Sequence, residues 1–393
     1  MSGERRPWSD NDTVGALSEL ARALDRIAEL APAPIRVAEQ SAGHGAAALP
    51  LQNLPAHLRF ARHWESHRHE LLRRTVNRVC PVCGGVDRWT WFSTQDGYRY
   101  DVCRFCGMVH IPDVLPMPVW DEYFASLPDA RRHLQEQLAQ SVSTGAWERD
   151  RVRFERYLAM IRRRGGGQRG DRLLDLGSFT GTWLRVAEQE GIQAHGVEGL
   201  AEAVSFAREQ FPHLRIEHLR TEELAPTTAG GQFDLVTMWE TLEHTIDPVS
   251  SLELAGSTLR PGGLIAVTVP NCWNVQFSVL GPFCFYAYGG YHGTGHINMF
   301  SPRTLTRALE AAGFDVLDMA TEFGTDWRQM LYFLLQRFDR IHCYANLVRQ
   351  GDTAEQIPAG MDILLNWLSP ALTRLENVYT AGPIITAVAR KRP

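Results

Sequence analysis

Two short stretches of the 393-residue sequence end in side chains that could hold a small ligand. LLDLGSFTG places Asp175 directly after an apolar run and follows it with Gly177 and Gly181, and HGVEG places Glu198 23 residues after Asp175 at the end of the next apolar run. A carboxylate at a strand end can accept hydrogen bonds from both hydroxyls of a ribose. The pair therefore predicts a nucleoside-binding loop.

The residue at position 179 narrows the choice of nucleotide. A dinucleotide-binding loop would need glycines at 177, 179 and 182, but the chain has Phe179 and Thr182. The glycine that is missing at 179 is the one that lets the backbone approach a pyrophosphate. The Gly-Lys-Ser/Thr ending of a P-loop is also absent from this loop. The loop therefore favours an adenosyl ligand without phosphates.

Four of the seven cysteines form two tight pairs. CPVCGG contains Cys80 and Cys83, CRFCGM contains Cys103 and Cys106, and nineteen residues separate the pairs. This spacing is typical of a zinc ribbon, in which four thiolates satisfy a tetrahedral Zn²⁺ and leave no open position. We therefore predict a structural zinc site. A redox dithiol pair and an iron–sulfur site are the competing interpretations.

Candidate catalytic and acceptor-binding residues lie in WETLEH and in YGGYHGTGHINMF. The second stretch is aromatic and rich in glycine, which is typical of a lid over an acceptor. A histidine there could take a proton from an acceptor hydroxyl near pH 7. In the alternative interpretation His296 only fixes its loop, and Glu243 with His244 holds the start of a helix. The candidates for proton transfer are His292, His296, His244 and Glu243, and those for acceptor binding are Glu240, Tyr288 and Tyr291.

Strands and helices alternate from residue 171 onward, with short connections. Such alternation predicts a doubly wound, Rossmann-like and mainly parallel seven-stranded sheet, with the ligand beyond the carboxyl ends of its strands. Amphipathic spacing predicts further helices at 12–30, 55–75 and 129–164. The expected divisions are an N-terminal helical region (1–75), the zinc ribbon (76–125), a helical linker (126–168), the core (169–326), a helical insertion or cap (327–378) and the last strand of the sheet (379–393).

The composition allows a sizeable core and sets limits on partners. The chain is 44% hydrophobic and 22% charged, with a net charge of −5, which disfavours a surface given over to nucleic acid. It contains no apolar run of about 18 residues that would span a membrane. Its N-terminus lacks the apolar segment of a signal peptide. A cytoplasmic location is therefore expected.

Five motifs in order resemble those of class I S-adenosylmethionine (SAM) methyltransferases. They are LLDLGSFTGTWL, GVEGLAEAVSFA, FDLVTMWETLEHTIDP, STLRPGGLIAVTVPN and HINMFSPRTLTRALEAAGF, and they are most similar to the bacterial group with an LEH-x-x-DP signature. The resemblance covers residues 171–320 and the final strand. It implies SAM as cofactor, with the ribose on Glu198. The implied cofactor-binding residues are Asp175, Gly177, Ser178, Phe179, Gly181, Glu198, Gly199, Arg220, Thr221, Met238 and Trp239.

A zinc ribbon before such a domain resembles an arrangement found in methylation of sugars, lipids and natural products. The resemblance implies transfer of a methyl group to an oxygen or carbon of a small molecule, a sugar or a lipid-linked acceptor. Two alternatives remain open: an RNA methyltransferase that grips its substrate with the ribbon, and a non-enzymatic protein on a degenerate methyltransferase fold. The intact Asp175, Gly177, Gly181 and Glu198 argue against the last. The sequence leaves the oligomeric state open.

Overall fold

The structure is a computed structural model, and the chain separates into two compact units, Met1–Pro50 and Leu51–Pro393. Everything described below belongs to the second unit. The predicted helix at 12–30, most of that at 55–75 and nearly all of the 327–378 insertion lie outside the described residues. The structure describes residues 67, 69–93, 99–126, 130–224, 231–274, 296–322, 372, 376 and 381–393.

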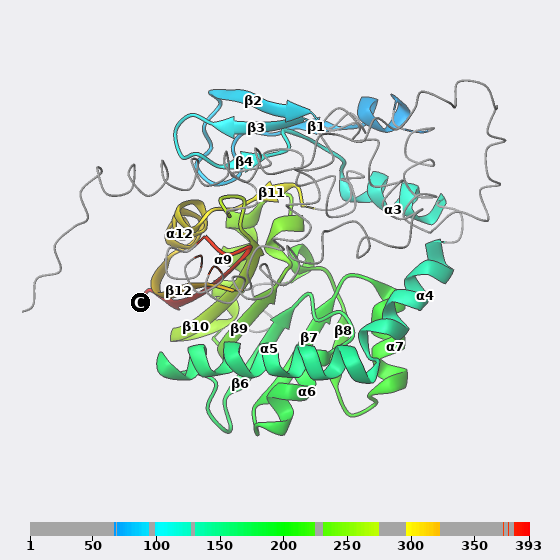
Figure 1. The fold of residues 1–393 in the computed structure, drawn as a ribbon, viewed down its shortest axis with the longest axis vertical. Coiled ribbons are helices and arrows are strands. Elements are labelled where there is room, and N and C mark those ends of the chain that lie inside the picture. Colours follow the sequence, from blue (N-terminus) through cyan, green and yellow to red (C-terminus); the bar gives the residue numbers. More distant parts are fainter. Residues whose placement is uncertain are drawn as a thin grey trace, which may run out of the picture. The chain divides into compact units, whose positions relative to one another are not determined.

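A seven-stranded sheet forms the centre of the unit (Figure 1), in the order β12-β13-β10-β9-β6-β7-β8. β13 is antiparallel to both neighbours, and the other pairs are parallel. The chain passes from β6 to β7 on one side and later returns to β9 on the other, which creates a switch point between β6 and β9. This confirms the predicted doubly wound sheet. The strands are β6 (Arg172–Leu176), β7 (Gln193–Glu198), β8 (Arg215–His218), β9 (Phe233–Trp239), β10 (Leu259–Pro270), β12 (Phe314–Glu322) and β13 (Ile384–Lys391).

Helices cover both faces of the sheet, as the alternation of side chains along each strand requires. Leu173 packs in the cluster formed with α5, α6 and α7, whereas its neighbour Leu174 packs in the cluster formed with α9 and α12. Apolar packing thus covers both faces of the sheet, and the polar side chains that could bind a ligand lie at the strand ends. The helices are α5 (Thr144–Arg163), α6 (Thr182–Gln189), α7 (Ala201–Gln210), α9 (Pro248–Thr258) and α12 (Pro302–Ala311).

Two element boundaries differ from the sequence prediction, which is one helix over 129–164 and another from Pro248 to the Pro-Gly-Gly turn at 261–263. The helical stretch at 129–164 is divided into α4 (Ala130–Ser141) and α5, because the Ser143 side chain accepts the Ala146 N–H and starts a new helix. Helix α9 ends at Thr258 and β10 already begins at Leu259, so the Pro-Gly-Gly turn lies in an irregular part of the strand. Ser301 caps α12 by accepting the Thr304 N–H.

The cysteine-bearing segment forms a small antiparallel sheet that is completed by the core domain. Its strand order is β11-β4-β3-β2, and β11 comes from the segment just before α12 (Figure 1). One continuous buried cluster contains Cys80 and Met108 together with Leu242 and Phe300. The elements are β1 (Val76–Asn77), β2 (Arg88–Ser93), β3 (Arg99–Cys103), β4 (Val109–His110), β5 (Asp113–Val114), α3 (Met117–Ser126) and β11 (Asn298–Met299).

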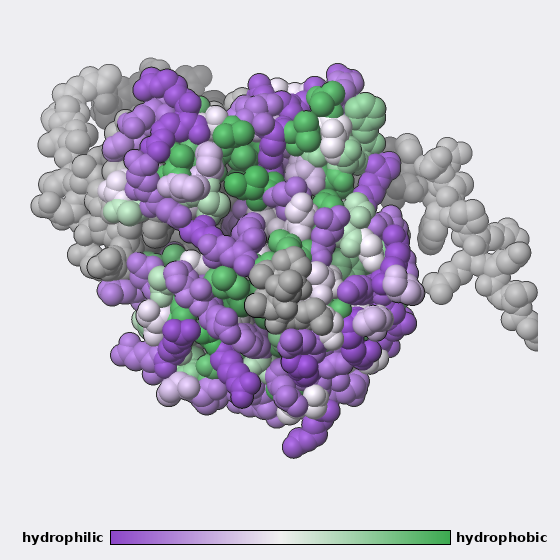
Figure 2. Space-filling view, turned by 180° about the vertical axis from the view of Figure 1, so that it is seen from behind, coloured by the Kyte–Doolittle hydropathy of each residue, from purple (hydrophilic) through white to green (hydrophobic). Residues whose placement is uncertain are grey.

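The surface has the mixed character of a globular domain. On the face shown in Figure 2, small hydrophobic groups are separated by hydrophilic side chains. Within the described part of the chain, no helix combines the length and the apolar character needed to cross a membrane.

Candidate functional site

The loop after β6 is shaped by two glycines with positive φ. Gly177 has φ +81°, and a Cβ there would lie 2.4 Å from Thr241 Oγ1. Gly181, at φ +77°, is the N-cap of α6, and its Cβ would lie 2.8 Å from Leu214. Because only glycine combines this φ with such close packing, the sequence fixes the turn that opens the crevice at the carboxyl ends of β6 and β9.

A cavity of about 420 Å³ lies at that crevice. The carboxyl ends of β6, β7 and β9 border it, as expected at a topological switch point. A larger cavity of about 770 Å³ lies at the opposite, amino-terminal region of β6 to β8, away from these residues. The smaller cavity is lined by Ser141, Asp150, Arg153, Phe154, Asp175, Gly177, Ser178, Phe179, Thr180, Thr182, Trp183, Glu198, Trp239, Glu240, Thr241 and His244.

Two carboxylates line this cavity, that of buried Asp175 and that of half-buried Glu198. Burial raises the pKa of Asp175 from its ordinary 3.8 to about 7, although the Thr237 hydroxyl donates to Asp175 Oδ1 at 2.6 Å. Trp183 Nε1 in turn donates to Thr237 Oγ1 at 3.0 Å and orients it. Burial also raises the pKa of Glu198. The cavity therefore disfavours further negative charge and suits a ligand that brings positive charge or hydroxyl donors.

Glu198 also holds the loop that carries Phe179. Its two carboxylate oxygens accept the backbone N–H groups of Phe179 and Leu200, each at 2.8 Å. Phe179 has φ +46°, a conformation that costs a non-glycine residue energy. Its side chain is 37% exposed at the cavity edge. Each carboxylate oxygen keeps a second acceptor position for a ligand hydroxyl.

An aromatic group forms the opposite wall. Trp239, at the end of β9, stacks on Tyr157 of α5 with 4.8 Å between ring centroids, and Trp183 meets it edge to face at 5.5 Å. Trp239 Nε1 is buried and has no hydrogen-bond partner. Glu240, which follows at φ +52°, pairs with Arg153 of α5 at 3.2 Å. The wall thus offers apolar area and one unused donor.

Five residues implied by the resemblance do not line the cavity, and one of them is Gly181 at the start of α6. Met238 is fully buried in the core on the other face of the sheet. Thr221 is buried in the short 3₁₀ helix Thr221–Glu223, and the Arg220 guanidinium pairs with Asp121 of α3 at 2.6 Å. Gly199 packs against the Arg220 side chain. Their contact with a cofactor stays a prediction.

Three of the candidate catalytic residues come together beside this cavity. Glu243 and His244 form the 3₁₀ helix Leu242–His244 after β9, and His296 comes from the segment before β11. Their potential ligand or proton-transfer atoms all lie within 4.8 Å of one another. His296 Nε2 is 3.8 Å from Glu243 Oε1, and the His244 and His296 ring centroids are 5.0 Å apart. His292, Tyr288 and Tyr291 lie outside the described residues.

The electrostatics of this triad favour neutral groups. Glu243 is fully buried, neither of its carboxylate oxygens has a hydrogen-bond partner, and burial raises its pKa well above the ordinary value. Desolvation, and secondly the charge of His244, lower the pKa of His296 to about 3. His296 is therefore a neutral imidazole at pH 7, and a pKa this low makes it a weak base, so its use in proton transfer stays a prediction.

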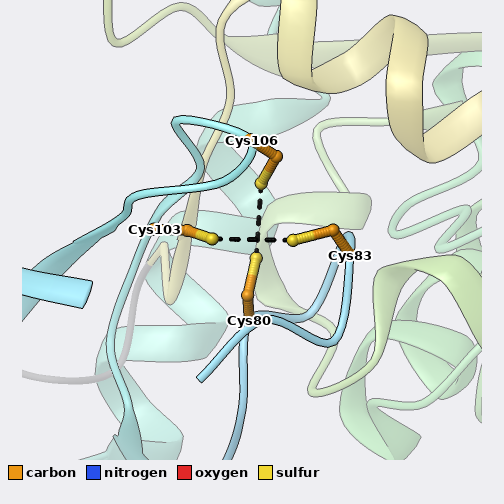
Figure 3. Close-up of side chains that lie close together, drawn as sticks. All are labelled: Cys80, Cys83, Cys103 and Cys106. Carbon is orange, nitrogen blue, oxygen red and sulfur yellow. Dashed lines mark hydrogen bonds between the residues drawn. The ribbon is translucent and has the colours of Figure 1, made fainter. Parts of the chain in front are cut away.

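The four paired cysteines converge on one point (Figure 3). Cys80 Sγ and Cys106 Sγ are 3.5 Å apart, as are Cys83 Sγ and Cys103 Sγ, and all four sulfurs lie within 4.8 Å of one another. Sulfurs around a tetrahedral Zn²⁺ lie about 3.8 Å apart for Zn–S bonds of about 2.3 Å. The donor set therefore fits a structural zinc ion.

Both knuckles have the same backbone. Gly84 N–H donates to Cys80 O and Gly107 N–H donates to Cys103 O, each at 2.9 Å, and both glycines have positive φ. A hydrogen bond from Cys80 lowers the pKa of Cys106 to about 5. The cluster therefore gives up a first proton readily, as metal binding requires.

Sequence reasoning did not find the contributions of α5 and α6 to the cavity. Arg153 and Phe154 lie some twenty residues before the glycine loop, in a helix with no motif of its own. Trp183 falls inside the quoted motif, but its spacing equally suits a core position of α6. Thr237 lies inside an apolar strand, and its hydroxyl was the only sequence signal that it could contact Asp175.

Comparisons with known proteins match this geometry. A family model for a methyltransferase domain matches residues 147–319. Ubiquinone biosynthesis O-methyltransferases of Aeromonas salmonicida and Aromatoleum aromaticum are 30% and 28% identical, over 42% and 40% of this chain and 71% and 69% of theirs. A solved SAM-dependent methyltransferase from Archaeoglobus fulgidus is 19% identical, covers 65% of this chain and 99% of its own length, and has a TM-score of 0.42.

The assignment rests on the sequence relatives and on the site rather than on that superposition. A 30% identical relative is matched over 71% of its length. The doubly wound sheet, the two loop glycines and the paired carboxylates occur where such enzymes need them. The chain belongs to the class I SAM-dependent methyltransferases and is an enzyme of that class.

Proposed function

We propose that this enzyme transfers the methyl group of SAM to a hydroxyl oxygen of a small-molecule acceptor, at the cavity between β6 and β9. When bound, SAM supplies a methyl group on a sulfonium, which makes the thioether a good leaving group. The 76–125 segment is assigned to a structural zinc ribbon, and 169–326 with 379–393 to the catalytic core. The segments 1–75, 126–168 and 327–378 are assigned as helical additions.

The charge of the cavity is the observation that carries the cofactor assignment. Buried Asp175 and half-buried Glu198 have raised pKa values and border the same 420 Å³ cavity. A cationic ligand with ribose hydroxyls relieves this cost, since it brings both opposite charge and donors. Glu198 would bind the ribose diol, and Asp175 would orient the amino-acid end of the ligand.

The choice of an oxygen acceptor is supported by the triad and by the relatives. A hydroxyl must lose a proton as it attacks, and a base positioned within hydrogen-bonding reach can accept it. We assign this step to His296, with Glu243 buried behind it at 3.8 Å and His244 alongside. The named relatives are O-methyltransferases of ubiquinone biosynthesis. The remaining requirement is in-line alignment of the acceptor about 3 Å from the methyl carbon.

Calorimetry tests the cofactor site. Glu198→Gln should weaken binding of SAM and S-adenosylhomocysteine by 10-fold or more, because a charge-assisted diol contact contributes about 1.5–3 kcal/mol. Glu217→Gln is the matched control, because Glu217 is an exposed carboxylate on neighbouring β8 that pairs with His195 instead. Equal affinities of the Glu198→Gln variant and the wild type would remove Glu198 from the site.

Methyl transfer from radiolabelled SAM to a panel of phenols, catechols and sugars tests the reaction. With any acceptor that is turned over, His296→Asn should lower kcat by about 10²–10⁴-fold with SAM affinity retained. His213→Gln, an exposed histidine paired with Glu188, is the control. An unchanged kcat in His296→Asn would place the base elsewhere.

The same triad is also a set of donors that a divalent cation would accept, since the three atoms lie within 4.8 Å of one another. Metal analysis separates this role from proton transfer. One zinc per chain, unchanged in Glu243→Gln, supports the proton-transfer role. A second metal that disappears in Glu243→Gln assigns the triad to metal binding instead.

A further inference from the structure

Arg78 lies in the cysteine-bearing segment but contacts the core domain. It follows β1 directly and precedes Cys80 by two residues. Its Nη1 donates to the carbonyl oxygen of Ile246, and its Nη2 donates to the carbonyl oxygen of Ile297 at 2.9 Å. One guanidinium thus joins two segments that lie 168 and 219 positions after Arg78 in the sequence.

The remaining donors of Arg78 complete a planar clamp. Nε donates to Ile111 O at 2.9 Å, and Nη2 also donates to Asn298 Oδ1 at 3.0 Å. All of these acceptors are uncharged oxygens, and burial lowers the pKa of Arg78 to about 10, so the group stays charged at pH 7. Bonds from a charged donor are about twice as strong as neutral ones. The fork geometry of arginine fixes the relative positions of its acceptors.

The two clamped segments are those that carry the triad. Ile246 lies two residues after His244, and Ile297 directly follows His296. Asn298 adds a second link, because its Nδ2 donates to Thr245 O at 2.6 Å while its Oδ1 receives Arg78. Arg78 and Asn298 therefore both link the segment that carries His244 to the segment that carries His296.

The zinc-ribbon sheet supports the same segment from the other side. The Tyr100 hydroxyl, on fully buried Tyr100 of β3, donates to His296 O at 3.0 Å. Ile111 N–H donates to Ile297 O at 3.0 Å, and His110 of β4 pairs with Asn298 of β11. The cysteine cluster anchors both β3 and Arg78, because Cys103 is the last residue of β3 and Cys80 follows Arg78 by two residues.

We propose that Arg78 is a positioning residue, through which the metal-loaded ribbon holds the His244 and His296 segments in their reactive arrangement. The ribbon thereby takes part in methyl transfer without touching the cofactor. This inference rests on the proposed role of the triad for its catalytic consequence, but the mechanical part can be tested without any acceptor.

Hydrogen exchange followed by mass spectrometry tests the mechanical part on the full zinc-loaded chain. In Arg78→Met, amides of residues 242–246 and 296–300 should exchange at least about 10-fold faster. In the wild type these segments can open only if the hydrogen bonds of Arg78 break, and the variant lacks those bonds. Amides of 172–184 and SAM affinity should stay within about two-fold of the wild type. Arg104→Met is the control, because Arg104 lies as close to the cysteines but pairs with exposed Asp87.

Kinetics test the catalytic part with any acceptor that the panel identifies. Arg78→Met should lower kcat by about 10–100-fold with little change in acceptor KM, since a shift near 1 Å of a reacting group has this effect. Arg78→Lys keeps the charge but loses the fork, and should recover only part of the rate. If no acceptor is turned over, the proposed function fails while the exchange result still decides the clamp.

Tyr100→Phe provides a second variant that leaves Arg78 in place and should loosen 296–300 selectively. Zinc content is measured for every variant, and Arg78→Lys replaces Arg78→Met if the latter loses zinc. Wild-type protection of both segments in zinc-loaded Arg78 and Tyr100 variants, or a kcat within two-fold of the wild type, would overturn the proposal. So would release of zinc that leaves 296–300 protected.

Discussion

Phe179 and Glu240 are, among the described residues, the non-glycine positions with positive φ, at +46° and +52°. Each follows a strand whose carboxyl end borders the 420 Å³ cavity. Such conformations persist only where the surroundings hold them. Glu198 fixes the first through the Phe179 N–H at 2.8 Å, and Thr268 fixes the second through the Glu240 N–H at 3.0 Å. Backbone strain is thus concentrated at the carboxyl ends of β6 and β9.

The positive φ at position 179 predicts that two substitutions there differ in their effect on the free energy of unfolding. Phe179→Gly should keep the free energy of unfolding within about 1 kcal/mol of the wild type, because glycine adopts positive φ freely. Phe179→Val should destabilise by about 1–3 kcal/mol, because a β-branched residue resists this region. Urea unfolding of both variants measures the difference. Equal loss in the two would show that contacts of the ring, not the backbone, dominate.

The raised pKa of Asp175 predicts that this residue lowers the stability of the ligand-free protein while it favours SAM binding. Its pKa is about 7 in the folded chain against an ordinary 3.8, so between these pH values the folded state holds a proton that the unfolded state has lost. This residue therefore lowers stability as pH rises through that window. Asp175→Asn should flatten the decline and stabilise the ligand-free protein at pH 8 by up to about 4 kcal/mol, while weakening SAM binding.

Urea unfolding between pH 5 and 8, with calorimetry of SAM, checks the Asp175 prediction. Glu253→Gln, at an exposed carboxylate of α9, should leave the pH dependence unchanged. A steeper decline in Asp175→Asn than in the wild type would contradict the assigned sign.

At the scale of elements, the ribbon sheet is incomplete without the core domain. Its strands β2 to β4 are short, and β11 of the core adds the fourth strand. Segments this small seldom bury enough apolar surface to fold alone, and a structural metal commonly supplies the difference. Met108 and Phe300 share one buried cluster, which predicts that the ribbon and the core unfold together.

Loss of one thiol should therefore have consequences beyond the ribbon. Cys83→Ser changes the exposed ligand, so it removes little packing of its own. We expect loss of the stoichiometric zinc and a lower thermal midpoint for the whole unit, with no separate transition for the core. Metal analysis and calorimetric scanning measure both. Cys272→Ser is the control at a cysteine outside the cluster, and full zinc retention in Cys83→Ser would contradict the tetrahedral site.

At the scale of the whole molecule, the arginines bear on the choice between RNA and a small-molecule acceptor. Among the described residues, those near the ribbon and at the end of α5 mostly contact oxygens of this chain, so few of these guanidinium groups are left to bind phosphates. The contacts are Arg74 with Glu122, Arg78 with carbonyls, Arg88 with Asp101, Arg99 with Asp101 and Asp113, Arg162 with Glu190, and Arg163 and Arg164 with Asp318.

This pairing predicts weak RNA binding. At 150 mM salt we expect no binding of total RNA tighter than the roughly 10⁻⁴–10⁻⁶ M typical of non-specific contacts. Titration at several salt concentrations, with and without SAM, measures it. Nanomolar affinity with a steep salt dependence would favour RNA as the acceptor.

The local chemistry could be predicted from short stretches because it depends on residue type and spacing. The glycines at 177 and 181 and the two Cys-x-x-Cys pairs fix their own backbone turns, and the alternation of apolar segments predicts the sheet. The helix break at Ser143 and the early start of β10 were missed, since a cap and a strand irregularity depend on single hydrogen bonds. Arg153 and Phe154 were missed because they reach the cavity from another helix.

The sequence by itself predicted the class of cofactor, four candidate metal donors and the order of the core elements, since each is marked by short motifs of definite residue type and spacing. Only the tertiary structure decided which side chains meet across the crevice. It brought His296 to Glu243 and His244, and Arg78 to both segments, over separations of 52 residues and more. Contacts of that range depend on how strands are ordered in the sheet, which no local spacing encodes.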